Sequence, residues 1–217
     1  MKEIKIGKIT LPIKVVFWCV AAFAFNFLVI FFTRWVNADV PKHDLSLPLD
    51  RRIPFLPGMT LIYWGCCPFW VATYLLAMRY DKGRGYRFIL AHFMADTVCF
   101  AFFLLLPTGM VRPEPTGRSL AAALARLTYR CDAPDNLFPS IHCYISWLCW
   151  IGVRKNPAIP RWYRVLSLVM ALAVCVSTLT VKQHVLVDVP AGILLAELCY
   201  ALAGWAEKRW LPNPRGD

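Results

Sequence analysis

Six runs of apolar residues, each about 20 residues long, divide most of this chain. A helix needs about 20 apolar residues to cross the hydrocarbon core of a bilayer, because each residue advances it by about 1.5 Å. Hydrophobic residues make up 59% of the chain and charged residues only 17%, which is unusual for a water-soluble domain. We therefore predict an all-α, polytopic membrane protein with six transmembrane helices at Ile13–Thr33, Thr60–Met78, Phe88–Leu106, Phe138–Val153, Trp162–Val181 and His184–Ala203.

The domain organisation and orientation follow from the segments between these runs. No linker or internal repeat is evident, so we predict one membrane domain over residues 1–217, made of an arm (1–12), a six-helix core (13–203) and a tail (204–217). Lys and Arg gather in the arm, the tail and the second–third and fourth–fifth connections, which predicts cytoplasmic N- and C-termini. The net charge of +11 then reflects topology and contact with anionic lipid, with no pattern that indicates nucleic acid.

The candidates for chemistry are ionisable residues at the predicted outer helix ends, because a charge inside a bilayer is costly. Arg112 follows the third run, His142 begins the fourth, and His184 and Asp188 begin the sixth. The predicted topology places these four residues at the same depth in the membrane, near its outer face. A single histidine at a helix end is more often an interfacial residue, so it is the combination that indicates a site.

The spacing of these residues predicts separate roles for the two histidines. His184 and Asp188 are four residues apart, so a helix would place them on one face, where Asp188 accepts a hydrogen bond from one ring nitrogen. The other nitrogen of His184 is then free to act as a nucleophile, while His142 protonates a leaving alcohol. Two helix N-termini, with Arg112 and Lys182, predict an anion site there. Nothing in the pattern requires a metal or another cofactor.

Two further groups of ionisable residues lie outside this cluster. His92 and Asp96 repeat the four-residue spacing inside the third run, on the cytoplasmic side of the outer group. We predict that they form a buried hydrogen-bonding pair that locks helices together, with a proton or substrate path as the alternative. Glu114, Asp132 and Asp135 lie in a long outer loop, where we predict solvated acids; a role in headgroup selectivity is the alternative.

Three motifs then make the chain similar to a known family: Arg112-Pro113, Pro139-Ser140-Ile141-His142 and His184-x-x-x-Asp188. In this order on six helices they resemble the type 2 phosphatidic acid phosphatase superfamily, and the likeness extends from about residue 50 onward. It implies that His184 becomes phosphorylated, that Asp188 orients it and that His142 protonates the leaving group. It also implies phosphate binding by Arg112. Further candidate phosphate contacts are Lys182, Ser140 and Ile141.

The chain also departs from the phosphatase pattern. Leu105 replaces a lysine, Ile141 a glycine and Thr178 an arginine of the family motifs, so two phosphate-binding cations are missing. The backbone N–H of Ile141 is still available as a donor. Residues 50–57 and 177–184 look like a bacterial branch grouped with inositol phosphotransferases and sphingolipid synthases, which raises the case for transfer to an alcohol in place of water.

The leading expectation is a lipid phosphate phosphatase with a metal-independent phosphohistidine intermediate, in a bacterial inner membrane with its active site facing the periplasm. One alternative is a phosphotransferase of the inositol phosphotransferase or sphingolipid synthase type. The other is a non-catalytic lipid-binding or transport protein. The substrate is expected to be a membrane lipid phosphate, with phosphatidic acid, phosphatidylglycerol phosphate, polyprenyl diphosphates and phosphosphingolipids all as candidates. The sequence makes no prediction of the oligomeric state.

Overall fold

The computed structural model of the protein describes residues 3–6, 9–79 and 82–210. Apart from a hairpin of β1 (Glu3–Ile6) and β2 (Ile9–Pro12), the described chain is all-helical. Its α-helices are α1 (Ile13–Val36), α2 (Thr60–Arg79), α3 (Lys82–Leu105), α4 (Leu120–Cys131), α5 (Ile141–Arg154), α6 (Arg161–Thr180) and α7 (Asp188–Trp210). Two 3₁₀ turns, Asp50–Arg52 and Pro57–Met59, lie between α1 and α2.

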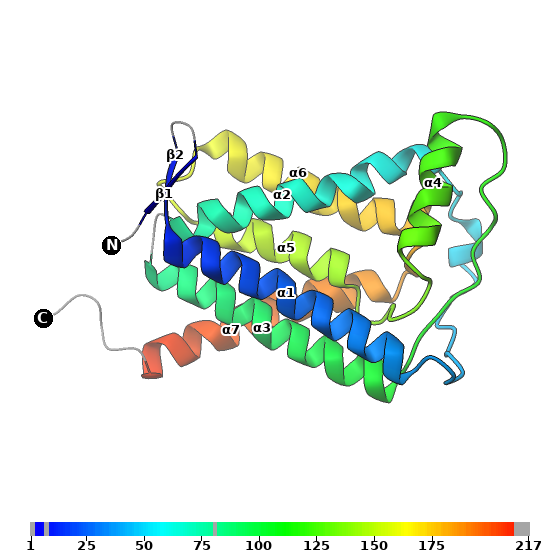
Figure 1. The fold of residues 1–217 in the computed structure, drawn as a ribbon, viewed down its shortest axis with the longest axis horizontal. Helices are drawn as coiled ribbons and strands as arrows, with labels where there is room; N and C mark the ends of the chain where they lie inside the picture. Colours follow the sequence, from blue (N-terminus) through cyan, green and yellow to red (C-terminus); the bar gives the residue numbers. More distant parts are fainter. Residues whose placement is uncertain (1–2, 7–8, 80–81, 211–217) are drawn as a thin grey trace, which may run out of the picture.

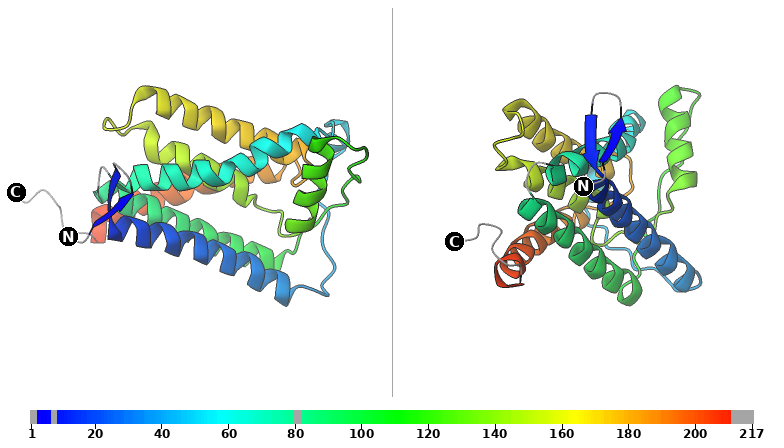
Figure 2. Two further views of the ribbon diagram at one scale, coloured as in Figure 1. Left: turned by 45° about the horizontal axis from the view of Figure 1, so that its top comes forward. Right: turned by 60° about the vertical axis from the view of Figure 1, so that its left-hand side comes forward.

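The long helices lie side by side as a bundle, with the termini of the described chain, β1 and the last turn of α7, at one end, whereas α4 crosses the other end (Figure 1). The two further views in Figure 2 show the same separation between the end with the termini and the end with α4. Five helices, α1, α2, α3, α6 and α7, are long and apolar enough to cross a membrane. The structure therefore supports a helical membrane protein, and the predicted fourth span, Phe138–Val153, corresponds to the shorter helix α5.

Helix α5 occupies the centre of the bundle. It packs against α2, α3, α6 and α7, and most of its side chains are buried, including Tyr144, Ile145 and Leu148. With 14 residues it is about 21 Å long, shorter than the hydrocarbon core of about 30 Å. The surrounding helices are longer, so α5 leaves a hollow at each of its ends.

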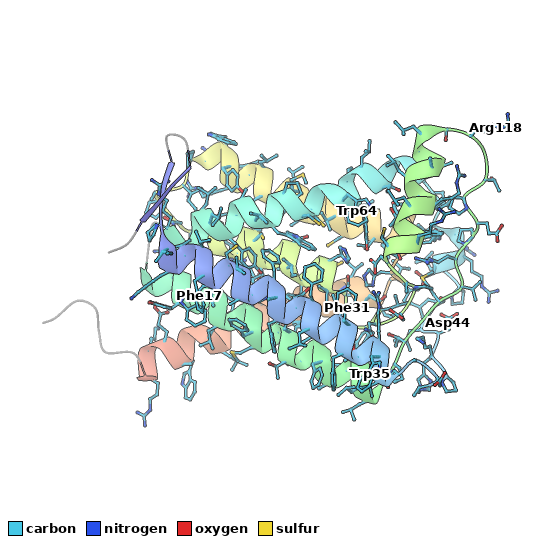
Figure 3. All side chains as sticks on the ribbon, in the orientation of Figure 1. Phe17, Phe31, Trp35, Asp44, Trp64 and Arg118 are labelled. Carbon is cyan, nitrogen blue, oxygen red and sulfur yellow. The ribbon has the colours of Figure 1, made fainter. Side chains whose placement is uncertain are left out.

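Large apolar side chains are exposed on the outer surface of the bundle. On α1, Phe17, Phe31 and Trp35 project outward along the helix in Figure 3, and each is more than 60% exposed. Apolar patches of this extent are rare on soluble monomers, whereas lipid chains solvate them. By contrast, Asp44 and Arg118 lie in the connections beyond the helix ends, at the end of the bundle where α4 crosses.

His92 and Asp96 are neighbours in a buried polar network, as predicted, but the hydrogen bond at Nε2 of His92 is to the carbonyl oxygen of Ala22, and Oδ2 of Asp96 has no hydrogen-bond partner among the described residues. Both side chains are fully buried, and Nε2 of His92 lies 3.1 Å from Oδ2 of Asp96. Asn26 of α1 and Tyr144 of α5 donate to Oδ1 of Asp96, and the hydroxyl of Tyr74 on α2 lies 2.7 Å from Nδ1 of His92. The network therefore links four helices in the middle of the bundle.

Several predicted boundaries differ from the structure, and three of them affect the site or the ends of the bundle. The last helix begins at Asp188 and not at His184, because the chain before it forms a turn. Helix α5 begins at Ile141 and not at Phe138, because Ser140 has an extended backbone and caps the helix with its side chain. The predicted tail is helical as far as Trp210, and its remainder, 211–217, lies outside the described residues. Helix α4 was not predicted at all.

Candidate active site

The turn between α6 and α7 positions His184. The backbone N–H groups of Gln183 and His184 both donate to the carbonyl oxygen of Thr178, at 2.9 and 3.1 Å. Lys182, with φ 59°, provides the left-handed residue that this reversal needs. Asp188 then accepts two hydrogen bonds at Oδ2, from Val185 N–H at 2.9 Å and from Nδ1 of His184 at 3.2 Å. The predicted His–Asp contact is therefore present, but a turn makes it and not one helix face.

His142 is the second residue of α5, and a close approach between α5 and α7 sets its position. The side chain of Ser140 caps α5 by accepting from Cys143 N–H at 3.3 Å. Gly192 of α7 lies against this cap, because a Cβ there would be 2.7 Å from the carbonyl oxygen of Ser140. Only glycine permits this contact, which brings the start of α7 beside the start of α5.

The two histidines face each other across a small cavity at the α4 end of α5. Their ring centroids are 5.9 Å apart, and both rings line a cavity of about 40 Å³. A water molecule needs about 10–15 Å³ measured in this way, so the space admits one compact polar group. Tyr63 stacks on His142 at 4.4 Å and Trp70 lies 5.5 Å from it, which fixes the plane of the ring.

Asp132 supplies the charge that acts on His142. It lines the same cavity, and its Oδ2 accepts a hydrogen bond from Tyr63, the residue stacked on His142. Burial alone would raise the pKa of Asp132, but the charge of His142 and the hydrogen bonds from Tyr63 and Arg34 hold it below its ordinary value. Asp132 is therefore ionised at neutral pH, and its charge offsets part of the cost that burial imposes on the protonated form of His142, the form that a general acid requires.

Arg34, at the end of α1, is the cation that lines the cavity, and the sequence analysis did not identify it as a site residue. Its guanidinium donates to Asp135 at 2.6 Å and to Asp132 at 2.9 Å. The prediction that Asp132 and Asp135 are solvated acids is wrong, because both are paired with Arg34. A signal was present, since Arg34 is the one charged residue near the outer end of the first run.

The four residues predicted to contact phosphate lie in different places. Arg112 is behind the cavity wall, where it donates to the carbonyl oxygens of Asp132 and Tyr129 and stacks on the Tyr129 ring. Lys182 points away and donates to the carbonyl oxygens of Asp50 and Ile53 at 2.9 and 2.7 Å. The structure therefore gives both cations other partners. Ile141 lines the cavity, and Ser140 is the buried cap described above.

Gln183 presents a buried donor without a protein partner. Its Oε1 accepts from Arg112 at 2.7 Å, and because a guanidinium only donates, the amide nitrogen must be the other terminus. That nitrogen, Nε2, is buried, and no acceptor among the described residues lies within hydrogen-bonding distance. Gln183 also lines the cavity. Unpaired buried donors are costly, which indicates that a ligand oxygen completes this one.

Comparisons with known proteins add no family assignment: no family model matches the chain, and no curated protein matches it. Among the described residues, no group of three or more His, Cys, Asp or Glu side chains is arranged to hold a metal ion. The side chains at this site that could take part in a reaction are two histidines, Asp132 and Asp188, one arginine and one amide donor.

The contact between Asp188 and His184 leads to a prediction of how activity at this site depends on pH. Burial lowers the pKa of His184, but the hydrogen bond and charge of Asp188 outweigh it, so the pKa lies above its ordinary value. Attack requires neutral His184, so we expect kcat/KM to fall as pH drops through this raised pKa. In Asp188→Asn the charge is lost and an amide oxygen can make only a weaker hydrogen bond, so the acidic limb should move to lower pH while the plateau falls. The test is the pH profile of kcat/KM for the wild type and for Asp188→Asn on one substrate. If the acidic limb does not move, it reports the titration of a group other than His184.

Proposed function

We propose that this protein is an integral membrane lipid phosphate phosphatase that works through a phosphohistidine at His184. The observation that carries the proposal is the pair of histidines facing one compact cavity, with Nδ1 of His184 on the Asp188 carboxylate. That contact makes Nδ1 the protonated nitrogen and leaves the lone pair of Nε2 available to a substrate. The motif resemblance supports the same assignment of roles.

The proposed reaction has two halves. Nε2 of His184 attacks phosphorus, the bond from phosphorus to the lipid oxygen breaks, and protonated His142 gives its proton to that oxygen. The products are a free lipid alcohol and a phosphoryl group on His184. Neutral His142 then accepts a proton from a water molecule that attacks the phosphorus, the P–N bond breaks, and inorganic phosphate leaves. Both histidines return to their starting states.

Gln183 and Arg34 are the groups proposed to bind the transferring phosphoryl oxygens. Arg112 holds the amide of Gln183 in place, so in this account it is a positioning residue. Loss of one donor to developing charge lowers kcat by about 10²-fold in other enzymes. We expect a similar fall for Gln183→Ala, measured as kcat and KM separately. Gln183→Glu, which keeps the contact with Arg112 but places a carboxylate near phosphate, should be no better. An unchanged kcat in both variants would remove Gln183 from the site.

The proposed topology has six crossings, of which the shorter helix α5 is the fourth. A 14-residue helix is short for this role, but α5 is surrounded by longer helices, so its polar ends meet protein and the two end cavities in place of lipid chains. The excess of Lys and Arg at the end with the termini predicts that this end is cytoplasmic. The two histidines then lie near the outer face, where a lipid phosphate of the outer leaflet has its headgroup.

The experiment is phosphate release from a panel of lipid phosphates and diphosphates, with a chelator present, by the full chain in detergent. Release that persists with chelator and is lost in His184→Ala supports the proposal. Product that forms only when a lipid or polyol alcohol is added would identify a phosphotransferase with the same first half-reaction. Lipid binding without turnover, unchanged in His184→Ala, would instead identify a non-catalytic lipid-binding protein.

A further inference from the structure

A second cavity lies at the opposite end of α5, where Arg154 ends the helix while α3 and α7 continue. Arg154 is twelve residues beyond His142, about 18 Å along the helix axis, so this cavity is separate from the histidine site. Its volume is about 310 Å³, within the usual range of about 300–1,000 Å³ for small-ligand sites. Figure 1 shows this end of α5 on the side of the bundle where the termini lie.

The charged lining of this cavity is mainly basic. Arg84 and Arg87 come from α3, Arg154 and Lys155 from the end of α5, and Glu197 is the one carboxylate among its described lining residues. Nη1 and Nη2 of Arg154 donate to the two carboxylate oxygens of Glu197, at 2.8 and 3.0 Å, so this carboxylate is already paired. The wall therefore carries an excess of positive charge inside a concave surface, which attracts an anion.

Arg87 is held in a fixed position by neutral groups. Its Nε donates to the carbonyl oxygen of Tyr200 at 2.9 Å, and its guanidinium lies 3.9 Å from the centre of the Tyr200 ring. Gly204 leaves room for it, because a Cβ there would be 2.3 Å from the guanidinium carbon. These contacts orient the arginine without neutralising its charge. A preorganised guanidinium of this kind suits the oxygens of a phosphate group.

The outer face of α7 indicates what kind of molecule carries the phosphate. Leu194, Leu198 and Leu202 are each more than 50% exposed and follow one another at four-residue intervals. Ala201, an exposed residue next to this stripe, lines the cavity. The stripe therefore leads from the basic cavity along the lipid-facing side of the helix, where acyl chains would lie. A free phosphate ion has no apolar part that could bind to such a surface.

We propose that this cavity binds the phosphate-bearing headgroup of an anionic lipid in the leaflet at the end with the termini. The headgroup phosphate contacts the cations from α3 and α5, and the acyl chains lie along the leucine stripe of α7. Because α5 ends before α3 and α7 do, it cannot contact them along their last turns. The bound lipid would hold the three helices together there. The proposal does not depend on the reaction proposed for the histidine site.

The test uses the full chain in detergent, with native mass spectrometry of bound lipid as the readout. Phosphatidylglycerol is the anionic probe, phosphatidylcholine the zwitterionic control and inorganic phosphate the competitor. Each cation near a headgroup strengthens binding by about fivefold. We expect phosphatidylglycerol to bind about fivefold more weakly to Lys155→Gln, an exposed position where the fold should tolerate the change, and more weakly again to the double variant with Arg84→Gln.

The matched control removes two exposed cations from the same end but outside the cavity, Arg161→Gln and Arg209→Gln. This variant should bind phosphatidylglycerol as the wild type does. Equal losses in both variants would show a general surface-charge effect and overturn the proposal, as would equal binding of phosphatidylcholine. Displacement of the lipid by inorganic phosphate at millimolar concentration would assign the cavity to a soluble phosphate and overturn the lipid assignment.

Discussion

His184→Ala is expected to reduce phosphate release by about 10⁵-fold or more, which is the scale of loss when an enzyme nucleophile is removed. The physical reason is that the alanine leaves no atom to form the covalent bond to phosphorus. Asp188 cannot take over, because it is fully buried and its Oδ2 is held by Val185 N–H. Single-turnover phosphate release, with a lipid phosphate identified from the panel, is the measurement.

The matched control for this variant is His43→Ala. His43 is an exposed histidine at the same end of the bundle, and its hydrogen bonds to Pro107 and Gly109 use only backbone atoms. We expect His43→Ala to keep wild-type turnover. If His184→Ala retained even one hundredth of the wild-type rate while remaining folded, His184 would not be the nucleophile.

His142→Asn is expected to lower turnover of a lipid phosphate by about 10³-fold, within the range for loss of a general acid. A lipid alcohol is a poor leaving group, so its oxygen needs the proton that His142 supplies. Asparagine cannot be a proton donor of the same kind, although it is a smaller polar side chain that fits between Tyr63 and His184. The rate constant of the first half-reaction, with the wild type as reference, is the measurement.

A nitrophenyl phosphate ester distinguishes this role from a structural one. Its leaving group departs without protonation, so the first half-reaction, measured as the burst of nitrophenol, should be only about tenfold slower in His142→Asn than in the wild type. An equal loss on both substrates would contradict the general-acid assignment and indicate that His142 only shapes the cavity. His184→Ala should remain inactive on both.

The sequence predicted the bundle well because the physical signal for a membrane helix is strong. Five of the six apolar runs correspond to helices long and apolar enough to span, and the His92–Asp96 pair is buried as predicted. Helix α4 was missed because its 12 residues are polar on one face and do not form an apolar run. Its cap, Ser119 accepting from Ala122 N–H, was the local signal available.

The site was predicted less completely than the bundle, because the positions of Arg34 and Gln183 depend on contacts between distant segments. The spacing of His184 and Asp188 indicated their contact, although a turn and not a helix produces it. No local pattern indicates that Arg34 reaches Asp132 and Asp135 across about a hundred residues, or that the side-chain oxygen of Gln183 accepts a hydrogen bond from Arg112. Such pairings are set by tertiary packing, so periodicity and motif spacing do not contain them.

The most direct measurement of the central proposal is to trap the phosphoryl group on the protein. A radiolabelled lipid phosphate, quenched within one turnover, should leave label on the chain that is stable to base and released by acid, as expected for a phosphoramidate. Peptide mapping should place it on His184, and His184→Ala should carry none. Label on another residue, or phosphate release at the full rate without any labelled protein at the earliest times, would contradict the proposed phosphohistidine mechanism.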